Sequence, residues 1–189
     1  MSGRIIPGGL RLGALGMIVP GVIALALIGL AAGAQTARPI VWLGEFSNMR
    51  YTEEHAYGYS VQLWREGETV FGFFLASEGL AGDTPTGLLD GVKFDSKTGR
   101  LSFRAKLTMG IDARQQPSRD LFEFDGKLAR ASLNGSLKHS NENISNRATT
   151  TQRISLKKLQ SNSTLSQPGS YAEWKQQADE ILRRRGPKW

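Results

Sequence analysis

The sequence contains no cysteine, and this absence excludes several kinds of protein at once. Without cysteine there is no disulfide framework, no thiolate zinc site, no cysteine nucleophile and no attachment point for the lipid of a bacterial lipoprotein. Histidine is nearly absent as well, since the chain has only 2. The 189 residues are nevertheless enough for one domain that buries a core without disulfides or metal.

Sequence motifs of enzymes are also missing. The chain has no G-x-S-x-G nucleophile elbow and no H-E-x-x-H metal motif. The Gly-rich stretch 79–85 is followed by neither a lysine nor a helix start, so it does not predict a phosphate site. We therefore predict no catalytic residue, no metal ligand and no cofactor.

Acidic residues are fewer than basic ones, 17 against 24, which gives a formal net charge of +7. The basic residues are spread along the chain rather than gathered in one patch, so nucleic acid is not an expected partner. We expect a solvated basic surface, and as an alternative a surface that meets a membrane or another envelope component. The sequence predicts no oligomeric state.

The chain has one long hydrophobic run, and it lies at the N-terminus. Residues 14–34 carry no charge, Arg4 and Arg11 precede them, and Ala32-Gly33-Ala34 forms an A-x-A cleavage site. This order predicts an export signal that is cleaved after Ala34 and a mature protein in the periplasm or outside the cell. The alternative is that residues 14–34 stay as a membrane anchor with the domain outside, because the run is near the length of a transmembrane helix.

Beyond this segment, eight stretches have the alternation and the flanking turn residues of β-strands. They cover residues 39–46, 56–65, 69–77, 86–95, 100–108, 121–128, 130–139 and 151–159. In the fifth, Leu101, Phe103, Ala105 and Leu107 alternate with polar residues, which is typical of an antiparallel sheet with one buried face. Before this stretch, residues 95–99 predict a tight turn with Gly99 in the left-handed conformation.

A helix should follow the last strand after a polar linker, residues 161–169. Ser170 and Glu173 have the spacing of a capping box. One helical face gathers the apolar residues Tyr171, Trp174, Ala178, Ile181 and Leu182.

These elements predict an all-β fold, an eight-stranded antiparallel up-and-down barrel with a C-terminal amphipathic helix. A two-sheet β-sandwich is the alternative. The predicted organisation is an export signal at 1–34, the barrel at 35–160, and the linker and helix at 161–189.

Aromatic residues occur on most of the predicted strands, and we expect the majority to form the core. Tyr59 and Trp64 are an odd number of positions apart in one strand, and so are Phe73 and Phe74. The members of each pair must therefore lie on opposite faces of the sheet. We expect the apolar face of the C-terminal helix to cover the outward-pointing members.

Residues 39–185 resemble the lipocalin/calycin group in architecture. In the first predicted strand, one face carries Ile40, Trp42, Gly44 and Phe46. This strand is similar to the first strand of those barrels, which also carries Gly and Trp. Eight meandering strands and an amphipathic helix follow in the same order. The resemblance implies that Trp42 packs at the floor of the barrel.

The resemblance also implies a cup that binds a small hydrophobic or amphipathic molecule, although a barrel of this size can also be filled by its own side chains. The candidate ligand contacts are aromatic residues of the predicted strands, namely Trp42, Tyr57, Tyr59, Phe73, Phe103 and Phe122. The first hypothesis is thus an exported binding protein, and the second is an envelope interaction or structural protein without a ligand.

An enzyme is the third hypothesis. Glu53, Glu54 and His55 form a polar cluster between the first two predicted strands, and such side chains can do acid–base work. Adjacent glutamates on a loop more often face water, and that is the structure we expect here. We expect His139, at the end of the seventh predicted strand, to lie on the surface.

Overall fold

Alternating inward and outward side chains produce one antiparallel sheet in the part of the chain that the computed structural model describes, residues 38–80, 84–111, 114–142, 149–160 and 168–185. Its elements are β1 (Ile40–Ser47), β2 (Arg50–Tyr51), β3 (His55–Glu66), β4 (Thr69–Leu80), β5 (Thr86–Phe94), β6 (Arg100–Leu107), β7 (Asp120–Leu128), β8 (Ser132–Asn141), β9 (Thr150–Lys158) and α1 (Tyr171–Arg185). The predicted export signal and the predicted linker at 161–167 lie outside these residues.

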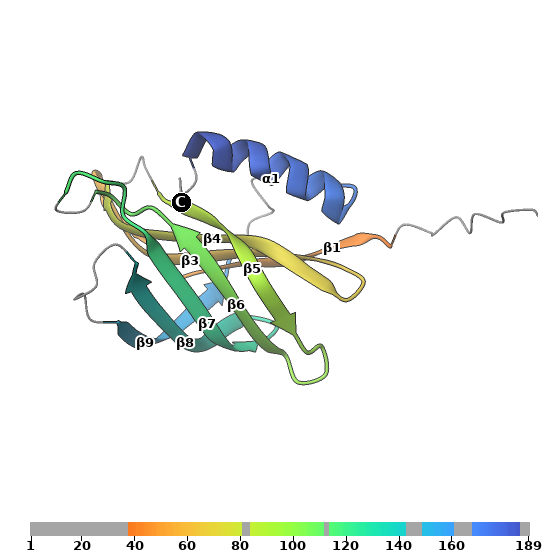
Figure 1. Cartoon of the computed structure of the whole chain (residues 1–189). Coiled ribbons are helices and arrows are strands. Elements are labelled where there is room, and N and C mark those ends of the chain that lie inside the picture. Colours follow the sequence, from red (N-terminus) through yellow and green to blue (C-terminus); the bar gives the residue numbers. More distant parts are fainter. Residues whose placement is uncertain (1–37, 81–83, 112–113, 143–148, 161–167, 186–189) are drawn as a thin grey trace, which may run out of the picture. The chain divides into compact units, whose positions relative to one another are not determined.

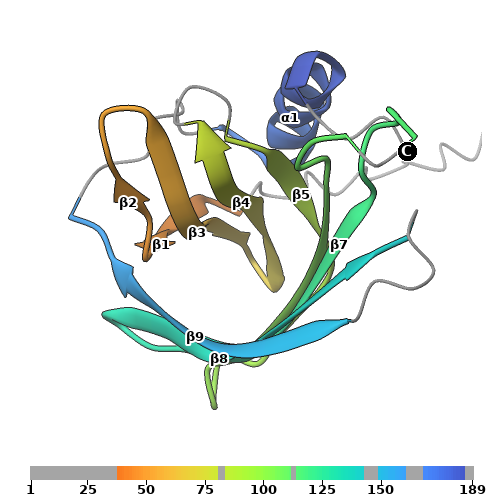
Figure 2. The same ribbon diagram turned by 90° about the vertical axis from the view of Figure 1, so that its left-hand side faces the viewer.

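The sheet closes into a barrel of eight strands, with the two-residue β2 added beside β3 (Figures 1 and 2). From β3 to β9, each strand pairs with the next one along the chain, and β1 closes the ring by pairing with both β3 and β9. The amount of pairing is uneven. β3 and β4 share twelve residue pairs, whereas β1 and β9 share two. The predicted up-and-down barrel is confirmed, and the sandwich alternative is wrong.

The strand limits agree with the prediction to within a few residues, and so does the turn between β5 and β6. Gly99 has a φ of +75°, and its N–H donates to the Asp95 carbonyl at 2.8 Å. A Cβ at this position would lie 2.5 Å from the Leu128 carbonyl oxygen. Glycine is therefore required here by both the left-handed backbone and the close approach of β7.

A β-bulge in β1 corrects the predicted face of the first strand. The pairing with β3 shifts between Trp42 and Gly44, so Leu43 is an extra residue that reverses which side chains face inward. Phe46 points into the barrel, but Ile40 and Trp42 lie on its outside. Trp42 therefore does not pack at the barrel floor; its ring contacts the outward-facing Trp64 at 4.6 Å between centroids.

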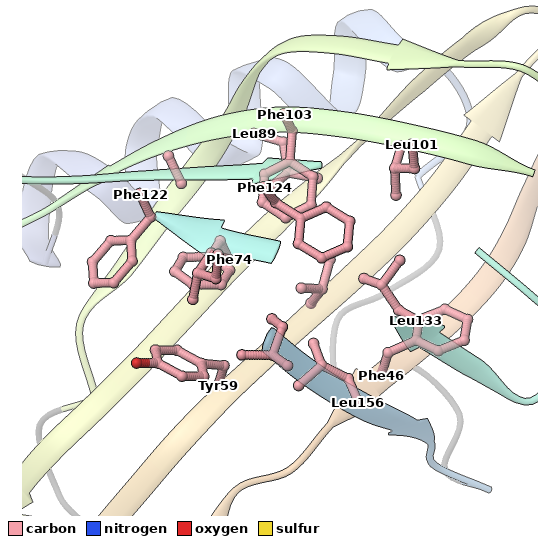
Figure 3. Packing of buried hydrophobic residues seen from close by; sticks show 14 of the residues in the cluster. Phe46, Tyr59, Phe74, Leu89, Leu101, Phe103, Phe122, Phe124, Leu133 and Leu156 are labelled. Carbon is pink, nitrogen blue, oxygen red and sulfur yellow. The ribbon is translucent and has the colours of Figure 1, made fainter. Parts of the chain in front are cut away.

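The barrel interior is filled by a single cluster of apolar side chains, here called the interior cluster (Figure 3). Aromatic rings occupy its middle, with 5.1 Å between the centroids of Phe74 and Phe122 and 5.0 Å between those of Phe103 and Phe124. These four side chains are 0–2% exposed. Side chains so enclosed leave almost no surface to water, so the middle of the barrel is densely packed.

A second cluster lies on the outside of β3 and β4 and is covered by α1 (Figure 1). Trp64, Phe71 and Phe73 point outward here, and Trp174 of the helix packs against both phenylalanines, with ring centroids 4.8 and 5.5 Å away. Ala178 is fully buried in the same contact. The predicted cover of the outward-pointing aromatic residues by the helix is confirmed. Among the described residues, no helix is long and apolar enough to cross a membrane.

The start of α1 has the predicted cap with one difference. The Glu173 N–H donates to the Ser170 hydroxyl at 3.1 Å, as a capping box requires. The Glu173 carboxylate accepts a hydrogen bond from the N–H of Gly169 at 2.9 Å. The Tyr171 N–H donates to the Glu66 carboxylate at 3.2 Å, which ties the first turn of the helix to the end of β3.

Candidate functional site

The predicted polar cluster between β2 and β3 does not form an organised site. Glu53 and Glu54 are exposed, and no hydrogen bond or ion pair among the described residues joins either to His55. His55 instead closes a tight turn, in which its N–H donates to the Thr52 hydroxyl at 3.0 Å, and its ring stacks on Tyr57. This agrees with the expected solvated loop, and an enzymatic role for it stays a prediction.

The six aromatic candidates for ligand contact are divided among three surroundings. Tyr59, Phe103 and Phe122 belong to the interior cluster. Trp42 and Phe73 belong to the cluster beneath α1. Tyr57 is 47% exposed on β3. A ligand role for these residues stays a prediction, and the structure does not bring them together around one space.

A buried carboxylate that the sequence did not single out lies at the first residue of β7. The Asp120 side chain is 2% exposed. One of its oxygens accepts hydrogen bonds from His139 Nε2 at 2.8 Å and from the Asn141 amide at 3.1 Å. The other accepts from the Ser118 hydroxyl and from the Met109 N–H, the latter at 3.1 Å. Each oxygen of the buried carboxylate thus accepts two hydrogen bonds.

These donors decide the charge of Asp120. Burial by itself would raise the pKa of the carboxyl group. The hydrogen bonds from His139, Ser118, Met109 and Asn141 outweigh burial and lower the pKa to about 2. Asp120 is therefore a buried anion at neutral pH.

His139 is the main partner of this anion, and its position corrects the prediction of a surface residue. Its side chain is 21% exposed, and its ring lies parallel to Phe122 with 4.3 Å between the centroids. The sequence did contain a signal. Asp120 continues the inward alternation of Phe122 and Phe124, and His139 continues that of Leu137. The alternation therefore places both side chains on the inner face, at the ends of their strands.

A cavity of about 400 Å³ lies beside Asp120 and His139 at one end of the barrel, and we call it the mouth cavity. In an up-and-down barrel the ends of β4, β6 and β8 meet the start of β7 at the same end. The lining comes from these ends and the β6–β7 connection, and consists of Ser77, Glu78, Gly79, Pro85, Thr108, Met109, Gly110, Ile111, Ser118, Asp120 and His139.

The mouth cavity lies directly beside the interior cluster. His139, which lines the cavity, stacks on Phe122, and Phe122 makes an edge contact with Tyr59 at 6.1 Å between centroids. The Gln152 amide donates to the Tyr59 hydroxyl at 2.6 Å. Polar groups at this end of the barrel thus lie next to packed aromatic rings.

The arrangement of Ser118, Asp120 and His139 does not favour nucleophilic catalysis. In a Ser-His-Asp triad the histidine lies between the other two and removes the serine proton. Here the carboxylate lies between them, and the serine hydroxyl donates to it directly. The described residues also contain no group of three or more His, Cys, Asp or Glu side chains suited to a metal ion. The arrangement can bind polar groups rather than activate a hydroxyl.

A broader depression of about 690 Å³ lies over the outer charged residues of β5–β9. Its charged groups already satisfy one another. Arg104 pairs with Asp90 at 2.9 Å, and Lys138 pairs with Glu123 at 2.6 Å. All four side chains are at least 37% exposed, so this depression is a solvated face of the barrel.

Comparison with known proteins finds no family model, no curated protein and no solved structure that matches this chain.

Proposed function

We propose that this chain is an exported binding protein that holds a small amphipathic ligand in the mouth cavity. The observation that carries the proposal is the cavity itself. It has the volume of a small-molecule site, and it combines apolar residues such as Met109 and Pro85 with the polar pair Asp120 and His139. A few fixed polar groups among apolar ones are what orients a ligand in such sites.

The densely packed interior supports binding at the end of the barrel rather than in its middle. Phe74, Phe122 and Leu137 are at most 1% exposed, so a ligand among them would have to displace packed side chains. At the mouth, by contrast, the space already exists, and the rigid interior beneath it fixes the positions of Asp120 and His139. We propose that the packed barrel holds the residues of the site in place and that the ligand binds at its end, not in its interior.

The closed barrel of eight strands, followed by a helix, supports a relation to the lipocalin/calycin group, which we propose as the family of this fold. The proposal does not transfer any ligand from that group.

Export of the protein is proposed from the sequence of residues 1–34. A basic start, an uncharged apolar run and an A-x-A site are the parts of a cleavable signal. The binding domain would then work in the periplasm or outside the cell.

Obstructing the mouth cavity tests the proposed function. Gly79 lines the cavity, its φ is not in the left-handed region, and no heavy atom lies within 4 Å of a Cβ added there. A Gly79→Trp substitution should therefore place a large ring at the edge of the cavity and obstruct it without disturbing β4. We expect native mass spectrometry of the protein, purified from a bacterial host that exports it, to detect a bound small molecule that Gly79→Trp lacks.

The matched control is Lys97→Trp, in the β5–β6 turn. It adds the same exposed aromatic surface elsewhere and should keep the bound molecule. Circular dichroism melting curves establish that both variants fold. If Gly79→Trp folds and carries the same molecule as the unmodified chain, or if neither carries any, the proposed function is wrong.

A further inference from the structure

We propose that the ligand of the mouth cavity carries a protonated amine or a similar organic cation. The inference rests on the proposed function, because it assigns the chemistry of the molecule that the same cavity holds. It follows from the charge of the lining, from the hydrogen-bonding groups left open there and from the field at the barrel end.

The lining of the mouth cavity is negative in a chain that is positive overall. The formal net charge of the chain is +7, yet the described residues of the lining include the carboxylates of Glu78 and Asp120 and neither lysine nor arginine. Arg119 lies in the same β6–β7 connection, but it is exposed and is not part of the lining. Among the described residues of the lining, a ligand anion would meet two carboxylates and neither lysine nor arginine.

Several donors of the lining are already engaged within the protein, whereas the Thr108 hydroxyl has no partner among the described residues. The backbone N–H groups of Met109 and Ser118 already donate within the protein, to Asp120 and to the Gly110 carbonyl. His139 Nε2 faces the Asp120 carboxylate at 2.8 Å, so this ring nitrogen is also engaged within the protein. The Glu78 carboxylate has no hydrogen bond or ion pair with any other described residue.

The charge of Glu78 also affects the Tyr59 hydroxyl, which lies near the mouth cavity. Burial raises the pKa of the Tyr59 hydroxyl, the hydrogen bond from Gln152 partly offsets this, and the nearby negative charge of Glu78 raises it further. Glu78 lies two residues along β4 from Ala76, the pairing partner of Tyr59, so its negative charge is next to this hydroxyl and favours positive charge there. Met109, Pro85 and Ile111 supply apolar surface for the remainder of the ligand. These features together match a short amphipathic amine.

Three probes of equal chain length separate the charge of the ligand from its apolar part. Hexylammonium, hexan-1-ol and hexanoate are each titrated into the purified full chain, and the heat of binding is measured. We expect hexylammonium to bind at least about tenfold more tightly than the other two, which corresponds to about 1.4 kcal/mol. Glu78→Gln should weaken hexylammonium binding by about threefold or more and leave hexan-1-ol unchanged.

The control is Glu68→Gln in the β3–β4 turn, at the other end of the barrel, which removes the same charge and should change none of the affinities. If hexan-1-ol or hexanoate binds as tightly as hexylammonium, and Gly79→Trp abolishes that binding, the cavity is a ligand site but the amine proposal is overturned. If none of the three probes binds, the amine proposal is overturned too, and the mass spectrometry of Gly79→Trp decides the proposed function separately.

Discussion

Asp120 shows how a single carboxylate keeps its charge where almost none of its surface meets water. The cost of removing a carboxylate from water is offset only when donors surround it. His139, Asn141, Ser118 and the Met109 amide supply those donors from β8 and from the connection before β7. Because the donors belong to different elements, the carboxylate also holds the first residue of β7 against the last residues of β8.

The low pKa of Asp120 makes part of the stability of the fold dependent on pH. The pKa is about 2 in the folded chain against 3.8 for an unperturbed aspartate. The stability from this group is therefore fully present above about pH 4 and is lost as the pH falls through about 2. We expect Asp120→Asn to be less stable than the unmodified chain at pH 7, and this difference to shrink by about 2 kcal/mol between pH 4 and pH 2.

Urea denaturation at pH 7, 4, 3 and 2 measures the two free energies of unfolding. Glu68→Gln in the exposed β3–β4 turn is the control, and its difference from the unmodified chain should stay nearly constant. A constant difference for Asp120→Asn over the same range would mean that the carboxyl group has no depressed pKa in the folded chain.

The strands illustrate which elements a sequence can predict. In β6, alternation of large apolar and charged residues leaves only one arrangement that buries the apolar face, so Leu101 to Leu107 were assigned correctly. In β1, the same rule placed Trp42 inside, because alternation alone cannot show where an extra residue interrupts the pairing. The glycine at position 44 was the sequence feature that indicated the bulge, and its φ of +138° in the structure is one that other residues rarely adopt.

The helix α1 is an element whose stability comes from packing against the barrel. Trp174 is 5% exposed between Phe71 and Phe73, but its indole N–H is buried with no acceptor among the described residues. We expect Trp174→Ala to lower the free energy of unfolding by about 3 kcal/mol, because it leaves a cavity beneath the helix. Trp174→Phe should cost less than about 1 kcal/mol, since it keeps a ring and removes the unpaired N–H.

Chemical denaturation of the two variants and of Lys175→Ala, at the exposed neighbouring position, gives the comparison. An exposed substitution of this kind should change the stability by less than about 0.5 kcal/mol. Equal stability of Trp174→Ala and Lys175→Ala would show that the helix is not docked on the barrel in solution.

At the scale of the whole molecule, the fold was predictable and the mouth cavity was not. Strand order follows from local connections, which the sequence shows through its turns and alternation. The cavity depends on Glu78, Met109 and His139, which come from three separate strand ends and meet only when the barrel has closed. Nothing near any one of them in the sequence indicates the others.

The proposed export signal also concerns the whole molecule, and its cleavage can be tested directly. If residues 1–34 are a cleaved signal, the exported protein should begin with Gln35, immediately after the A-x-A site. N-terminal sequencing of protein recovered from outside the cytoplasm gives the answer directly. An intact Met1 in the exported protein would instead support the anchor, and Ala34→Arg, which spoils the cleavage site, is the control for processing.

The number of paired residues differs between neighbouring strands of the barrel, and it is smallest between β1 and β9. β1 is held to β3 by seven residue pairs but to β9 by only two, Phe46 with Lys158 and Ser47 with Lys157. Two further contacts lie beside them, from the Leu159 N–H to the Glu45 carbonyl and from the Lys158 ammonium to the Leu43 carbonyl. Opening the cylinder at this junction breaks fewer backbone hydrogen bonds than opening it anywhere within the β3–β4 hairpin. The β4–β5 junction has only three residue pairs, so backbone pairing holds the barrel least tightly at these two places.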